Sequence, residues 1–148
     1  MFSHPSLDAM DMGPTILVID DDRSILELLR HVLAGLAARV VTATNGLSGI
    51  RIFKARRPDL VLTDLMMPGA TGLEVVQTIR SFDTQIPVVL MSGHADYMST
   101  LAQQYGFTAV LRKPMNLNEL EAVLKPLLDR TAEPNTAAPE AGQAACQA

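Results

Sequence analysis

The chain has 148 residues, a size typical of one domain with its own hydrophobic core. Its net charge is −4 and no block of Lys and Arg occurs, so it lacks the electrostatic footprint of a nucleic-acid binder, and we predict no direct DNA binding. No run of about 18 apolar residues and no signal peptide is present, which excludes a membrane span. The single cysteine, Cys146, cannot form an internal disulfide. These features predict a cytoplasmic protein.

In the first half of the chain, short apolar runs rich in β-branched residues alternate with segments of helical periodicity. The apolar runs predict strands over residues 15–19, 40–43 and 60–63. Ser24 is a candidate N-cap for the first helix, and Gly35 is its predicted end. Asn45 or Gly46 opens the second helix, whose basic last turn suits the negative end of a helix dipole.

The same alternation continues through the second half. Two further strands are predicted over residues 88–91 and 107–111. A helix follows Gly72, a weaker one of small and polar residues spans 95–104, and Asn116 caps the last one. We expect a flexible N-terminal segment over residues 1–13 and a disordered tail over residues 131–148, which is too poor in large apolar residues to pack.

Five strands that alternate with helices indicate an α/β fold with a parallel sheet and helices on both faces. Right-handed crossovers bring the carboxyl ends of all parallel strands to one edge. Several polar residues directly follow strands and are therefore expected to meet there. They are Asp20, Asp21, Asp22, Asp64, Ser92 and Lys113.

Carboxylates that meet in a partly buried place repel one another unless a cation or a proton compensates. Because the set holds oxygen ligands and no histidine or thiol cluster, we predict Mg²⁺, with Mn²⁺ as the alternative. Asp22 is also a candidate helix N-cap. Lys113 adds an ammonium, Ser92 a hydroxyl and Gly93 an open backbone N–H. Together they match what a phosphoryl group on a carboxylate needs.

Four motifs carry a resemblance to a known family. They are ILVIDDD (16–22), LVLTDLMMPGATG (60–72), VVLMSG (88–93) and LRKP (111–114). In this order and spacing they resemble the receiver domain of two-component response regulators, over about residues 14–130. The resemblance implies a flavodoxin-like, doubly wound sheet of order 2-1-3-4-5.

The resemblance also implies a role for each matching residue. Asp64 would be the phosphoacceptor, and Asp20 and Asp21 the metal-site acids, with Asp64 and the backbone carbonyl of Met66 as further metal ligands. Ser92 would bond a phosphoryl oxygen and Lys113 would pair with the phosphoryl group. The peptide bond between Lys113 and Pro114 would be cis.

The implied function is to take a phosphoryl group from a histidine kinase or a histidine phosphotransfer protein and to change the surface offered to a downstream protein. Such a domain is no enzyme beyond its own phosphoryl transfer and autodephosphorylation. Two other interpretations stay open. The chain can be the receiver module of a hybrid histidine kinase or phosphorelay, or an unphosphorylated docking domain. A haloacid-dehalogenase-type phosphohydrolase is disfavoured, because it needs an acid where Met66 stands.

The chain departs from the family pattern at two positions. Val110 replaces the usual aromatic residue of the last strand, so no ring can report phosphorylation. Thr71 stands where an acid is common, a change expected to matter little. Met66 and His94 occupy the two positions beside the site that, in the family, tune how quickly water removes the phosphoryl group. A thioether cannot orient water, whereas an imidazole can.

Overall fold

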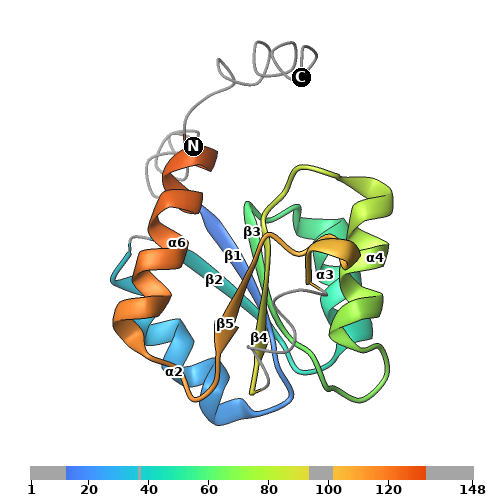
Figure 1. Ribbon diagram of the computed structural model, residues 1–148, viewed down its shortest axis with the longest axis horizontal. Helices are drawn as coiled ribbons and strands as arrows, with labels where there is room; N and C mark the ends of the chain where they lie inside the picture. Colours follow the sequence, from blue (N-terminus) through green and yellow to red (C-terminus); the bar gives the residue numbers. More distant parts are fainter. Residues whose placement is uncertain (1–12, 37, 94–101, 133–148) are drawn as a thin grey trace, which may run out of the picture.

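A computed structural model describes residues 13–36, 38–93 and 102–132 (Figure 1). Five parallel strands form one sheet in the order β2-β1-β3-β4-β5, which confirms the predicted flavodoxin-like topology. The strands are β1 (Thr15–Ile19), β2 (Arg39–Ala43), β3 (Leu60–Asp64), β4 (Val88–Ser92) and β5 (Ala109–Arg112). The first four extend over the predicted runs within one residue, while β5 begins two residues later than predicted.

Helices cover both faces of the sheet, as Figure 1 shows. They are α2 (Arg23–Ala34), α3 (Gly46–Arg56), α4 (Gly72–Phe82) and α6 (Leu117–Ala132). Leucines of α2 and α6, such as Leu29 and Leu124, share one buried cluster with Ile16 of β1. Phe53 of α3 and Val76 of α4 belong to a second cluster on the opposite face. The sheet is therefore buried on both sides, which explains why its strands are apolar runs without alternation. No helix within the described ranges is long and apolar enough to cross a membrane.

Most predicted helix ends are confirmed, with one correction. Asn45 caps α3 by accepting from the backbone N–H of Ser48, and Gly35 is the C-cap of α2. The N-cap of α2 is Asp22 and not Ser24, because the carboxylate of Asp22 accepts from the Ser24 N–H at 2.9 Å. Ser24 already lies inside the helix.

Two predicted segments fall partly outside the described residues. Of the helix predicted over residues 95–104, only its end is described, where residues 102–105 are helical. Helix α6 continues to Ala132, two residues beyond its predicted end, and the rest of the predicted tail is outside the described residues. The same holds for residues 1–12 of the predicted N-terminal segment.

Thr71 has a structural role that the sequence analysis underestimated. Its hydroxyl accepts from the Glu74 N–H at 3.2 Å, while the Glu74 carboxylate accepts from the Thr71 N–H at 2.8 Å. This capping box begins α4 directly after the loop that follows Asp64. The sequence signal was present, because Thr71 and Glu74 have the T-x-x-E spacing of that motif.

Gly72, the first residue of α4, lies against the end of β3. A Cβ atom added there would overlap the backbone carbonyl of Asp64 and touch the Cα of Leu65 at 3.0 Å. The Gly72 N–H also donates to the Leu65 carbonyl at 2.8 Å. Only a residue without a side chain lets α4 start this close to the strand that carries Asp64.

Gly72→Ala is therefore expected to lower the free energy of unfolding by about 2–3 kcal/mol, because the backbone around Asp64 has to move. Urea denaturation measures the loss. Gly93→Ala is the matched control: nothing lies within 4 Å of an added Cβ there, so its change should stay within about 0.5 kcal/mol. Equal losses in both variants would contradict the close-packing argument.

Candidate functional site

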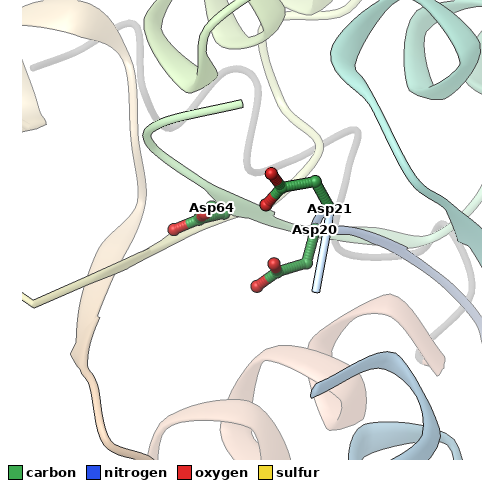
Figure 2. A group of neighbouring side chains, drawn as sticks. All are labelled: Asp20, Asp21 and Asp64. Carbon is green, nitrogen blue, oxygen red and sulfur yellow. The ribbon is translucent and has the colours of Figure 1, made fainter. Parts of the chain in front are cut away.

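Three carboxylates meet at the carboxyl ends of β1 and β3. Asp20 and Asp21 directly follow β1, and Asp64 is the last residue of β3. Since β1 and β3 are neighbours with Ile19 opposite Thr63, the acids after both strands reach the same edge. One oxygen from each carboxylate lies within 4.8 Å of the others. In Figure 2 the side chains of Asp20 and Asp21 project toward the side on which Asp64 lies.

Lys113 joins this group from β5, the outer strand on the other side of the sheet from β2. It follows β5, and its Nζ lies 2.9 Å from Asp20 Oδ2 and 3.1 Å from Asp64 Oδ1. Its backbone N–H donates to the Ser92 carbonyl at 3.0 Å, so its position is fixed by the end of β4. The Lys113–Pro114 peptide bond is cis, as expected. The predicted convergence of Asp20, Asp21, Asp64 and Lys113 on one edge is thus present in the structure.

The three acids differ in burial and in what holds them. Asp20 is fully buried, and its two oxygens have separate partners: Oδ1 accepts from the Asp22 N–H at 2.9 Å and Oδ2 from Lys113. The Asp64 side chain is 13% exposed, and Asp21 is exposed. Asp20 is therefore a fixed charge under the site, whereas Asp64 and Asp21 are open to a ligand.

Charge is not balanced within this group. Three carboxylates face one ammonium, so an ion of charge +2 would fit a site that carries a net charge of about −2. Burial raises the pKa of Asp64; Lys113 opposes the shift, and the charge of Asp20 adds to it. Burial pulls the pKa of Lys113 down, but hydrogen bonds to Asp20 and Asp64, with their charges, raise it above its usual value.

The other predicted site residues surround the acids. Ser92 is the last residue of β4, buried to 2% exposure, and Gly93 follows it with open space beside its Cα. Met66 lies in the loop between β3 and α4, and the residue is 70% exposed. Val110 of β5 is partly buried against the cluster of α3 and α4. His94 lies outside the described residues. The roles assigned to all of them stay predictions.

Comparison with known proteins agrees with this architecture. The sequence model of the response regulator receiver domain matches residues 16–125. The match covers well over half of the chain and includes both acidic strand ends and Lys113. The chain belongs to the response regulator receiver domain family, and hence to two-component signalling.

Individual similar proteins are also response regulators or receiver domains. MtrA of Mycobacterium leprae, a DNA-binding response regulator, is 34% identical over 120 residues, which are 80% of this chain and 53% of that protein. The crystal structure of a receiver domain protein from Clostridium thermocellum has a TM-score of 0.74 and 31% identity, and the match covers 79% of this chain and 95% of that one. The chain spans between about a fifth and about half of the length of the curated relatives it matches.

A third similarity shows the fold alone. The receiver domain of a sensor histidine kinase from Pseudomonas aeruginosa has a TM-score of 0.72 at 23% identity, with coverage of 79% of this chain and 98% of that one. The structure of that domain contains a magnesium ion coordinated in its active site cleft.

Lys113→Met is expected to lower the free energy of unfolding by about 2–3 kcal/mol at pH 7 in metal-free buffer. The reason is that the fully buried Asp20 carboxylate loses its ammonium partner. Chemical denaturation measures the loss, with Lys125→Met on the exposed side of α6 as the control. The double variant Asp20→Asn, Lys113→Met should regain part of the lost free energy of unfolding. A Lys113→Met protein as stable as wild type would show that the ion pair does not hold the site together.

The raised pKa of Lys113 predicts an alkaline limit to the stability that the ion pair contributes. A group whose pKa is higher in the folded state stabilises the fold fully below its unfolded pKa and loses that effect as pH rises through the folded-state pKa. The difference in unfolding free energy between wild type and Lys113→Met should therefore shrink above about pH 10. Urea titrations of both proteins in metal-free buffers test this. A difference that stays constant to higher pH would contradict it.

Proposed function

We propose that this receiver domain takes a phosphoryl group onto Asp64 from the phosphohistidine of a histidine kinase or a histidine phosphotransfer protein. The observation that carries the proposal is the Asp64 carboxylate itself: it is partly exposed, lies 3.1 Å from the Lys113 ammonium, and shares an edge with two further acids. A carboxylate in such a place can act as a nucleophile toward phosphorus.

A divalent cation fits the residues present. The donor set is all oxygen, which suits Mg²⁺ or Mn²⁺, and the excess of negative charge is what such an ion would neutralise. Asp20, Asp21, Asp64 and the backbone carbonyl of Met66 would hold it. When bound, Mg²⁺ would neutralise charge on the phosphoryl oxygens during transfer. The magnesium in the Pseudomonas domain is a precedent within the same fold.

In the transfer, an oxygen of Asp64 forms a new P–O bond while the P–N bond of the donor breaks, and the leaving imidazole takes the electron pair. Lys113 would pair with one phosphoryl oxygen, and the Ser92 hydroxyl would bond another. The Gly93 N–H is a third donor with open space beside it. These three residues stand at or directly after the ends of β4 and β5, which place them at the same edge as Asp64.

The phosphoryl group would leave by hydrolysis within the same site, and no other substrate is turned over. The exposed Met66 thioether beside the site cannot position water, which favours a long-lived phosphoryl group. His94 would be the group that orients water if it faces the site. We place the protein in the cytoplasm and take residues 14–130 as the receiver unit.

Phosphorylation would change a protein-binding surface without an aromatic switch. Val110 has no ring to turn inward, so the change has to come from the segment after Ser92 as that hydroxyl approaches the phosphoryl group. The downstream partner is a protein in this proposal. The lack of direct DNA binding remains a prediction, since relatives such as MtrA are DNA-binding regulators and the chain spans about half of that protein. Membership of a hybrid kinase or phosphorelay fits the same chemistry.

Incubation with acetyl phosphate and Mg²⁺ should add the mass of one phosphoryl group to the intact protein. Asp64→Asn should gain none, because it lacks the nucleophile. Removal of Mg²⁺ with EDTA should abolish the gain, and Asp21→Asn should reduce it at least tenfold while the fold stays intact. Intact-protein mass spectrometry measures each case.

Asp129→Asn, an exposed change at the far end of α6, is the control and should behave as wild type. Equal phosphoryl uptake by wild type and Asp64→Asn would remove Asp64 as the acceptor. A wild type that takes up nothing from acetyl phosphate or from a phosphorylated histidine kinase would instead favour the docking-only interpretation.

A further inference from the structure

A basic cleft runs along β2, the outer strand of the sheet, and shares no lining residue with the acidic group. It has a volume of about 610 Å³ and is lined by Arg39, Val40, Val41 and Thr42 of β2, together with Thr15 of β1, Arg30 of α2 and Arg56 of α3. Within the described part of the chain, β2 has β1 as its only neighbouring strand. This cleft has no part in the proposed phosphoryl transfer.

The backbone of β2 offers hydrogen-bonding groups to this cleft. At one end of the strand the Arg39 N–H donates to the Pro14 carbonyl at 2.8 Å, and at the other the Ala43 carbonyl accepts from Asp20 N–H at 3.1 Å. In a parallel pair, alternate residues of a strand bond to the same neighbour. Residues 39, 41 and 43 therefore bond to β1, and the N–H and C=O groups of Val40 and Thr42 point outward into the cleft.

Three arginines flank that edge from both faces of the sheet. Arg30 lies on the α2 side, where its Nη2 is 3.3 Å from Thr42 Oγ1. Arg39 and Val41 are two residues apart in β2 and therefore face the same way, and Val41 packs on the α3 side of the sheet. Arg56, the last residue of α3, is on that side too. All three are exposed, and none forms an ion pair with a carboxylate of the described residues.

We propose that this edge binds an extended, acidic peptide segment of a partner protein, which adds to the sheet as a strand beside β2. The backbone of such a segment would pair with the outward groups of Val40 and Thr42. Its carboxylates would meet the arginines. Arg30 lies on the α2 face of the sheet, and Arg39 and Arg56 lie on the α3 face, so the bound segment needs acidic side chains on both faces. Because successive side chains of a strand point to opposite faces, these acids would stand at neighbouring positions of the segment.

Two other occupants fit the cleft less well. A phosphate-rich small molecule would be attracted by the guanidinium groups but repelled by the outward carbonyls of Val40 and Thr42, which need N–H donors opposite them. A second copy of this chain would pair β2 with β2 and bring two sets of arginines together. An acidic strand satisfies the donors, the acceptors and the charges at once.

The test uses the full chain and a decapeptide library in which every position is Val, Thr, Glu or Asp, beside a matched library with Lys in place of the acids. Surface-immobilised pools are probed with labelled protein. Acidic members should bind at least tenfold more tightly than any Lys member. Binding should fall at least tenfold for the triple variant Arg30→Glu, Arg39→Glu, Arg56→Glu. It should stay within twofold for the double variant Arg51→Glu, Lys125→Glu, which changes exposed charges outside the cleft.

Two further measurements separate strand addition from simple charge attraction. The amides of Val40 and Thr42 should become protected from hydrogen exchange when the tightest peptide binds, and N-methylation of alternate amides in that peptide should weaken binding at least tenfold. Thermal melts confirm that each variant is folded. The proposal is overturned if no acidic member binds better than the Lys pool, if the triple variant binds equally well, if neither amide is protected, or if inorganic pyrophosphate binds more tightly than every peptide.

Discussion

The contact that the functional part of this structure depends on is the one between the Lys113 ammonium and two carboxylates, Asp20 at 2.9 Å and Asp64 at 3.1 Å. The three residues come from the ends of β1, β3 and β5, which are far apart in sequence. They meet only because every strand runs in the same direction, so that all carboxyl ends share one edge. A sheet with one reversed strand would send one of these charges to the opposite end of the molecule.

Within this group, burial gives residues of one type different roles. Asp20 is fully buried and has both oxygens hydrogen-bonded, so it holds the ammonium in place. Asp21 is exposed, while Asp64 lies between these extremes with its side chain 13% exposed. Asp22 accepts from the first turn of α2 and serves the fold. Four aspartates, three of them adjacent in sequence, thus differ in burial and in the groups that hold them, although their side chains are the same.

The parts of this structure that local patterns encode could be predicted from the sequence. Apolar runs located the strands, and the residues after them located the site, because strand ends meet by topology alone. The order of the strands came from the family resemblance, since long-range pairing leaves no local signal. Contacts between segments were missed for the same reason. Gly72 looked like a helix start, and its closeness to the Asp64 carbonyl appears only when α4 packs against β3. The capping role of Thr71, by contrast, is local and could have been predicted from its T-x-x-E spacing with Glu74.

The same strand order also explains why the acidic and the basic features lie apart. Order 2-1-3-4-5 puts β1 inside the sheet, so the backbone that carries Asp20 is braced by neighbours on both sides and can hold a buried charge. It leaves β2 outside, where arginines stand beside the outward groups of Val40 and Thr42, and their like charges would disfavour the pairing of two identical edges. The chain has a net charge of −4. The arginines beside β2 would nevertheless attract an acidic segment, whereas the carboxylates at the carboxyl ends of β1 and β3 would repel it. The phosphoryl donor and the added strand that we propose would therefore meet different residues of the domain.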